Sequence, residues 1–498
     1  MSDERTESIL QRLAELRADD APTHGGRVLS YVYDSGLAEL DELARAAAAS
    51  VQAVNGLDPT AFPSVARMEA DVITFACELV HASAHDRDVT GLVTSGGTES
   101  CLLAVKSARD RWRAAGGTGV PRIVAPVTVH AAFHKAAHYF GLDLELVPVD
   151  EQGVVDTAEL TARLTTQTAL VVVSAPCYPF AALDPVAEIA GAAADRGVAC
   201  HVDACIGGWV LPFWSDGGEG LSPWDFRVPG VTSVSLDAHK YGFAPKGASV
   251  LLFGDPDAKR AASFATTRWP GYPVVNPTML GSRSAMSLAA TWAIVAYLGP
   301  DGFAALTARS RSATHTLQEC ISGIVGLRVV GDPIGPLFAV AADHTVADGD
   351  QVDPHIWADR VRELGWVLQP QPGLHQADGP DLPRTTHLTV TPVTGDEVDG
   401  LTAALIAAAD DVRGVPGVDL GELLSAMPEL AVDAGADSAT AGGILRDLGL
   451  AGEDAGGALP DQLAPVMALL DVMPARRSEA LLTELLARCN ERHRHGDH

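Results

Sequence analysis

Two ionisable residues at the ends of apparent strands carry the strongest chemical signal in this sequence. Asp203 lies in HVDACIGG, and Lys240 lies one strand and loop further along, in SLDAHKYGFAPKG. A carboxylate can keep a pyridine nitrogen protonated, and a partly desolvated lysine can form a Schiff base with an aldehyde. Each residue alone suits an ordinary role, as a turn aspartate or a surface lysine. Together they indicate pyridoxal-5′-phosphate (PLP), with Lys240 as its Schiff-base lysine and Asp203 as the partner of its ring nitrogen.

A glycine-rich turn in front of an apparent helix could bind the cofactor phosphate. Gly96, Gly97 and Thr98 lie in TSGGTES, between a strand and a helix. Glycines let the backbone approach an anion, and the first N–H groups of the helix are free to donate to it. The same residues also suit a plain capping turn. They match neither a P-loop nor the dinucleotide fingerprint.

Three histidines follow the next strand. His130 ends VTVH, where its imidazole could stack on a cofactor ring or simply satisfy backbone groups at a strand end. His134 and His138 follow at helical spacing. Because no fixed carboxylate accompanies them, we predict no metal site here.

The segments that must position these residues alternate between strand and helix patterns from about residue 90 to 255. ALVVVSAP is typical of a buried strand, and DPVAEIAGAAADRG of the helix that follows it. This alternation predicts a mostly parallel sheet with helices on both faces. Ligands of such sheets bind at the carboxyl ends of the strands, where Asp203 and Lys240 are expected.

The chain of 498 residues is too long for one simple core. We expect four units. They are an N-terminal helical arm (1–85), a large PLP-binding domain (86–284), a smaller α+β domain (285–412) and a helical C-terminal extension (413–498).

Composition excludes several classes of partner. The formal net charge of −29 disfavours a nucleic-acid surface and a polybasic membrane patch. The seven cysteines contain no C-x-x-C pair, and the start MSDERTESIL has no signal pattern. No apolar run reaches the length of a membrane span. We therefore expect a cytoplasmic enzyme without a membrane segment.

From about residue 26 to about residue 395 the sequence resembles the PLP-dependent decarboxylases and lyases of fold type I, and most closely the sphingosine-1-phosphate lyase family. The segments that carry the resemblance are TSGGTES, SAPCYPFAALDPV, HVDACIGGWVLPF, VTSVSLDAHKYGFAPKGASVLLF and WPGYPVVNPTMLGSR. The order of HVDACIGG and DAHKYGFAPKG is highly specific, whereas TSGGTES occurs in several PLP families.

The resemblance implies a set of cofactor contacts. Gly97 and Thr98 would hold the phosphate, with Gly96 in the same turn, and His239 would touch it. His130 would stack on the ring between the phosphate turn and the ring-nitrogen partner Asp203. It also implies a homodimer with shared active sites, in which Gly281 and Ser282 of MLGSR reach the phosphate from the other subunit.

The resemblance further implies substrate-side groups at Tyr33, Asn55 and Lys246. Without it, these would be a packed loop tyrosine, a turn asparagine and a surface lysine. One departure concerns the substrate. Where the family has a histidine near the substrate phosphate, this chain has Asp58 in NGLDPTAFP, and a carboxylate repels a phosphate.

Three functions follow from these features. The first is retro-aldol cleavage of a phosphorylated long-chain base to a fatty aldehyde and phosphoethanolamine, with Lys246 and Tyr33 as candidates for the base or the phosphate clamp. The second is α-decarboxylation of an amino acid on the same scaffold, which Asp58 favours because it weakens a phosphate pocket. The third is a regulatory protein without catalysis, which the intact pair of Asp203 and Lys240 disfavours.

Overall fold

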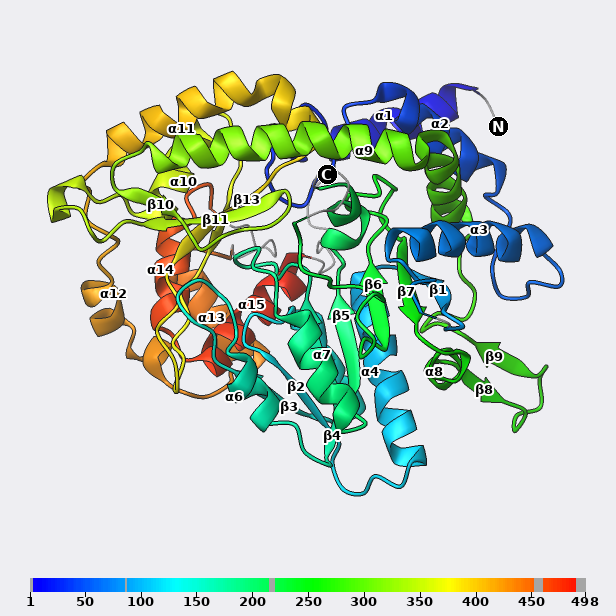
Figure 1. Ribbon diagram of the computed structural model, residues 1–498. Helices are drawn as coiled ribbons and strands as arrows, with labels where there is room; N and C mark the ends of the chain where they lie inside the picture. Colours follow the sequence, from blue (N-terminus) through cyan, green and yellow to red (C-terminus); the bar gives the residue numbers. More distant parts are fainter. Residues whose placement is uncertain (1–2, 86, 215–219, 452–459, 490–498) are drawn as a thin grey trace.

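A seven-stranded sheet forms the centre of the computed structural model, which describes residues 3–85, 87–214, 220–451 and 460–489 (Figure 1). Its strand order is β1-β7-β6-β5-β4-β2-β3. The strands from β6 to β3 pair in parallel, whereas β7 pairs antiparallel with both β6 and β1. The strands are β1 (Thr90–Thr94), β2 (Arg122–Pro126), β3 (Asp143–Val147), β4 (Thr168–Ser174), β5 (Ala199–Asp203), β6 (Ser233–Leu236) and β7 (Ser249–Phe253).

The residues of β4 explain why helices cover both faces of this sheet. Val171 and Val173 belong to one buried cluster, whereas Leu170 and Val172 belong to another. Because successive side chains of a strand point to opposite faces, a strand whose central residues are all apolar must be covered on both sides. The covering helices of this region are α3 (Pro63–Leu79), α4 (Gly97–Ala114), α5 (Ala131–Phe140), α6 (Thr157–Ala162), α7 (Val186–Asp195) and α8 (Pro256–Ala262).

A long helix connects this region to a second, smaller sheet. Helix α9 (Met286–Ser322) is much longer than its apolar segment alone predicts, and it is kinked at Gly299 and Pro300. The sheet that follows has the antiparallel order β10-β11-β13-β12, covered by α10 (Pro354–Glu363) and α11 (Val398–Val412). Its strands are β10 (Leu327–Val329), β11 (Leu337–Ala342), β12 (Gln369–Gln371) and β13 (Thr385–Thr389).

Helices also lie near both ends of the part of the chain that the structure describes. At the start lie α1 (Asp3–Leu16) and α2 (Ala38–Ser50), and α2 packs along α9. At the end lie α12 (Gly421–Ala426), α13 (Ser438–Asp447), α14 (Ala464–Val472) and α15 (Ala475–Cys489). Helix α14 contacts the small sheet and is anchored there, because the carboxylate of Asp359 accepts hydrogen bonds from the Leu463 and Ala464 amides.

A two-stranded hairpin, β8 (Phe264–Thr266) and β9 (Val274–Asn276), projects from the side of the large sheet (Figure 1). The predicted fold is confirmed: a mostly parallel sheet with helices on both faces, a smaller α+β region and C-terminal helices. Within the described ranges, no helix has the length and apolar character needed to cross a membrane.

Candidate active site

A cavity of about 390 Å³ opens where the carboxyl ends of the parallel strands meet the start of α4. This is the edge at which open α/β sheets bind ligands. Its lining contains all the residues proposed from the sequence for the ring and phosphate of the cofactor within one subunit. These are Gly96, Gly97, Thr98, His130, Asp203, His239 and Lys240.

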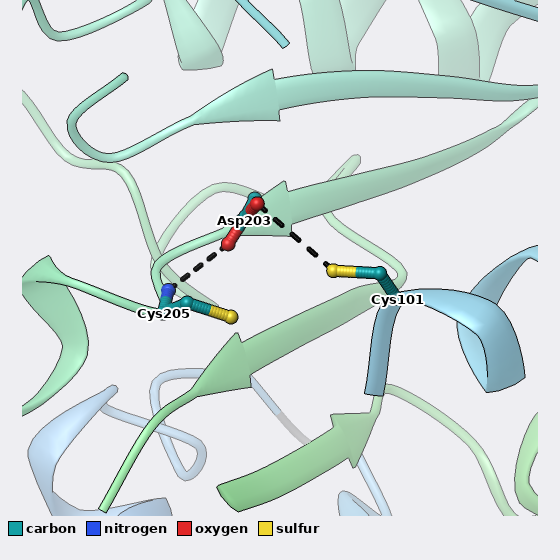
Figure 2. Close-up of side chains that lie close together, drawn as sticks. All are labelled: Cys101, Asp203 and Cys205. Carbon is teal, nitrogen blue, oxygen red and sulfur yellow. Dashed lines mark hydrogen bonds between the residues drawn. The ribbon is translucent and has the colours of Figure 1, made fainter. Parts of the chain in front are cut away.

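Asp203 is fixed at the floor of the cavity by the loop that follows β5 (Figure 2). Its Oδ1 accepts a hydrogen bond from the Cys205 amide at 3.0 Å, and its Oδ2 lies 4.0 Å from the Cys101 sulfur. The hydrogen bond to Cys101 and burial raise the pKa of Cys205 well above its usual value, so this neighbour is a neutral thiol.

A buried polar network lies behind Asp203. The Ser235 hydroxyl, on β6, lies 3.4 Å from Asp203 Oδ1 and 3.2 Å from His201 Nε2. His201 Nδ1 in turn lies 2.8 Å from the Ser233 hydroxyl. Burial lowers the pKa of His201 to about 4, so the ring is neutral. This network fixes the orientation of the carboxylate from the side away from the cavity.

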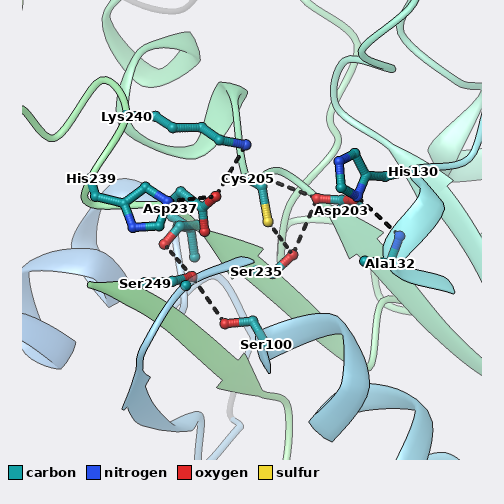
Figure 3. A network of polar contacts seen from close by, with 12 residues as sticks. Ser100, His130, Ala132, Asp203, Cys205, Ser235, Asp237, His239, Lys240 and Ser249 are labelled. Atoms are coloured by element: carbon teal, nitrogen blue, oxygen red, sulfur yellow. Dashed lines mark hydrogen bonds and ion pairs between the residues drawn. The ribbon is translucent and has the colours of Figure 1, made fainter. Parts of the chain in front are cut away.

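Lys240 lies across the cavity from Asp203, in the turn after β6 (Figure 3). Its ammonium nitrogen is 3.1 Å from Oδ2 of Asp237, and His239 Nε2 is 3.5 Å from the same oxygen. The side chains of Lys240 and Asp237 are 19% and 2% exposed. Asp237 was not singled out from the sequence, although its place three residues before the lysine was the signal that could have identified it.

The glycine turn is shaped by this group of residues. Gly96 has φ +155°, and a Cβ there would lie 3.1 Å from His239 Cε1. A Cβ at Gly97 would lie 2.6 Å from Asp237 Oδ2, closer than any real side chain. No side chain caps α4 at Gly96, so its first N–H groups are available to an anion. Glu99 accepts from the Ser95 and Met279 amides and does not occupy this position.

His130 lies at the mouth of the cavity as the N-cap of α5. Its Nδ1 accepts a hydrogen bond from the Ala132 amide at 3.2 Å. The imidazole is exposed and lines the cavity. The histidine therefore satisfies a backbone amide and also lines the cavity, and its stacking on a cofactor ring stays a prediction.

Tyr33 and Lys246 come together beside Lys240, although they lie far apart in the sequence. The Lys246 ammonium is 4.7 Å from the centre of the Tyr33 ring, and that ring packs edge-on against Tyr241 at 5.2 Å. Desolvation and the charge of Lys240 lower the pKa of Lys246. Burial raises the pKa of Tyr33 above its usual value, so the phenol is protonated.

Tyr178 also lines the cavity and was missed by the sequence analysis. Its ring stacks on the buried imidazole of His387, on β13, with centroids 4.4 Å apart. Burial raises the pKa of Tyr178, so its hydroxyl is a hydrogen-bond donor at neutral pH. Only the contact between the two sheets places this tyrosine, and no local pattern indicates it.

Six of the predicted site residues do not line the cavity of their own subunit. Two of them, Tyr33 and Lys246, lie beside Lys240 as described above, and the other four lie further away. Asn55 forms an isolated β-bridge with Ser284, and the Gly56 amide donates a hydrogen bond to the Arg283 carbonyl at 2.8 Å. These contacts join residues 55–56 to residues 283–284. Asp58 is exposed and accepts hydrogen bonds from Thr60, which lower the pKa of Asp58. Gly281 and Ser282 are exposed on the adjoining loop.

The cavity fits PLP on several independent counts. Asp203 offers an anion for a protonated ring nitrogen, and the uncapped start of α4 offers N–H groups for a phosphate. Lys240 lies in the same cavity as both. The glycines leave the turn without side chains, because a Cβ at Gly97 would overlap Asp237.

Family models match the same region. Residues 34–321 match the family described as the pyridoxal-dependent decarboxylase conserved domain. Residues 421–488 match the family described as the C-terminal putative HTH domain of pyridoxal-dependent enzymes. The first match contains the whole cavity lining.

Individual proteins also match. The chain is 36% identical to sphingosine-1-phosphate lyase of Dictyostelium discoideum over 70% of this chain and 66% of that one. It is 37% identical to sphingosine-1-phosphate lyase 1 of Rattus norvegicus over 68% of this chain and 59% of that one. The chain thus spans less than two thirds of these curated relatives. A solved sphingosine-1-phosphate lyase of Burkholderia pseudomallei matches with TM-score 0.75 and 32% identity, over 83% of this chain and 92% of that one.

Proposed function

We propose, from the premise that this chain belongs to the sphingosine-1-phosphate lyase family of PLP-dependent enzymes, that it is a carbon–carbon lyase. Its substrate would be a phosphorylated long-chain base, and its products a fatty aldehyde and phosphoethanolamine. The observation that carries this proposal is the meeting of Tyr33 and Lys246 beside Lys240, with 4.7 Å between the Lys246 ammonium and the Tyr33 ring. A phenol and a cation beside the reactive lysine can serve a β-hydroxyl and a phosphate.

Each residue of the cavity has a distinct task in this reaction. Bound PLP supplies an electron sink for the bond that breaks. Asp203 keeps the ring nitrogen protonated, and His130 covers the ring. The N–H groups at Gly97 and Thr98, with His239, hold the cofactor phosphate. Lys240 exchanges places with the substrate amine.

The substrate-side step requires a base that removes the proton of the β-hydroxyl. Tyr33 and Lys246 are the candidates because both lie next to Lys240. The lowered pKa of Lys246 favours its neutral amine, and its charge in the protonated form suits a phosphate. Both residues are therefore candidates for the base and for the phosphate clamp.

The alternative function is α-decarboxylation of an amino acid, with the same electron sink and a different bond broken. Asp58 favours it if this carboxylate lies near the substrate. Product analysis with two substrate panels distinguishes the reactions. We expect aldehyde from phosphorylated long-chain bases and no carbon dioxide from free amino acids. Carbon dioxide without aldehyde would establish the decarboxylase. No turnover in either panel would favour a protein without catalysis.

We further propose a homodimer with shared active sites. Asn55, Asp58, Gly281 and Ser282 form one strip outside their own cavity, in which Asn55 is half-buried and the other three residues are exposed. Large apolar side chains are exposed on the same two segments and next to them: Leu57, Met279, Leu280 and Met286. A second copy of the chain would cover these side chains and receive the four residues of the strip at its cavity.

The remaining proposals concern location and partners. The seven cysteines are free thiols, which suits the cytoplasm. Residues 421–488 contain eleven Asp and Glu but four Arg, so we propose that this helical unit does not bind nucleic acid, whose phosphates require positive charge. The division of the chain at residues 85, 284 and 412 is also a proposal.

A further inference from the structure

One carboxylate of the cavity has no part in the mechanism described so far. Asp237 follows β6 and is 2% exposed. Its Oδ2 is the atom shared by Lys240 Nζ at 3.1 Å and His239 Nε2 at 3.5 Å. A Cβ at Gly97 would lie 2.6 Å and 2.7 Å from its two oxygens. The glycine turn therefore packs directly on this carboxylate, and the carboxylate cannot turn away on that side.

The charges around Lys240 come from several elements. Asp237 is the one carboxylate within ion-pair distance of Lys240 in the part of the chain that the structure describes. Other ionisable groups that influence Lys240 or lie near it are Tyr33, Tyr178, Asp203, Cys205, His239 and Lys246.

These groups favour an ion pair over two neutral groups. Burial alone would lower the pKa of Lys240, but the charge of Asp237 outweighs it and raises that pKa. Burial alone would raise the pKa of Asp237, but Lys240 and His239 outweigh it and lower that pKa. Both partners are therefore charged when Lys240 is not bonded to the cofactor.

We propose that Asp237 is a positioning residue that holds Lys240 as an ammonium in the cofactor-free protein and after the substrate amine has displaced the lysine. This inference rests on the proposed lyase function and adds a proton donor to it. When the substrate amine takes the place of Lys240, the released amine gains one proton from the substrate ammonium or from solvent. Asp237 then keeps the ammonium beside the reacting carbon.

The proton balance would close over one turnover. After the aldehyde has left, the Lys240 ammonium would give its proton to the carbon from which the aldehyde departed, and the neutral lysine could then displace the product amine. The base would return the proton of the β-hydroxyl to that departing amine. The same ion pair opposes loading of the cofactor-free protein, because only a neutral lysine attacks the PLP aldehyde.

This opposition gives a test that needs no substrate. The rate of PLP capture by the cofactor-free protein is measured against pH from the visible absorbance. For the wild type, we expect the rate to rise tenfold per pH unit without levelling off up to the ordinary lysine pKa of about 10.4. For Asp237→Asn, we expect capture at neutral pH to be at least about tenfold faster, with levelling off at lower pH, because the largest of the charges that oppose the effect of burial is removed. Asp237→Glu retains the charge and should follow the wild type.

Two results would overturn the proposal. One is a wild-type rate of PLP capture that levels off at a pH well below the ordinary lysine pKa, which would mean that Lys240 is neutral. This result can be obtained even if the variants fail to fold. The other is a folded Asp237→Asn variant with the wild-type pH profile, which would leave Asp237 with a structural role only. Because no substrate is present, either result is independent of the product analysis that tests the lyase function.

Discussion

The ammonium of Lys246 lies 4.7 Å from the centre of the Tyr33 ring, so a residue of the N-terminal segment and a residue of the loop after Lys240 meet next to the reactive lysine. The pair contains a cation for the phosphate of a phosphorylated β-hydroxy amine and a phenol that can hydrogen-bond to its β-hydroxyl.

Substitution of each partner should separate these roles. Lys246→Met should raise KM for a phosphorylated base at least about tenfold, because a charge-assisted hydrogen bond contributes roughly 1.5–3 kcal/mol. Tyr33→Phe retains the ring under the ammonium and should lower kcat with little change in KM if the hydroxyl moves the proton. Steady-state kinetics decide, and a fall of kcat alone in Lys246→Met would reverse the assignment.

Lys240 should be the residue that captures the cofactor. The purified protein should be yellow, and borohydride should attach the cofactor permanently to the tryptic peptide that contains Lys240. Lys240→Ala should lose this attachment, while Lys246→Ala serves as the matched control and retains it. Mass spectrometry of the peptides checks the site, and labelling of any other lysine would refute the central assignment.

Asp203→Asn should bind PLP but lose most of the turnover. An amide cannot stabilise a protonated ring nitrogen as a carboxylate does, and one charged hydrogen bond lost in the transition state means at least about tenfold in rate. The Cys205 amide can still donate to the Asn oxygen, so the loop should keep its shape. Turnover near the wild-type rate would place the partner of the ring nitrogen elsewhere.

A mixture of two inactive chains should regain activity if the active sites are shared. In a dimer of Lys240→Ala with Ser282→Trp, both changes fall in one site and the other site stays whole. Random subunit exchange should then restore about a quarter of the wild-type activity. Ser322→Trp, at the far end of α9, is the matched control and should itself be active. Exchange shown by mass without any recovery would contradict shared sites.

Asp184 should make the stability of the fold depend on pH. Its Oδ2 accepts a hydrogen bond from the Ser174 amide at 2.7 Å, and burial raises the pKa of Asp184 to about 7. In the unfolded chain this carboxyl ionises near its ordinary value, so protons favour the folded state. The stabilisation is complete below the unfolded pKa and is lost as the pH rises through about 7.

Urea unfolding of the wild type and of Asp184→Asn tests this dependence. Between about pH 5 and about pH 8 the wild type should lose on the order of 2–3 kcal/mol more than the variant. The amide retains the acceptor for Ser174 and cannot ionise. Parallel pH dependences of the two proteins would mean that Asp184 stays neutral or ionised over this whole range.

The sequence by itself determined the fold class and the identity of the central residues. The alternation of apolar strands and helices is a local pattern, and it predicts the parallel sheet because each element must bury its own apolar face. Asp203 and Lys240 could be identified because each lies in a specific motif at the end of its strand. Strand ends of a parallel sheet share one edge, so their meeting followed from the fold class.

Only the tertiary structure decided which other residues join them. Tyr178 lines the cavity because its ring stacks on His387 of the second sheet, a contact that no periodicity encodes. Asp237 pairs with Lys240 because the turn after β6 folds back on itself under Gly97. Asn55 and Asp58 lie on the surface because their segment pairs with residues 283–284 instead of entering the cavity. Such contacts depend on how separate elements pack, which is a property of the whole chain and not of any one segment.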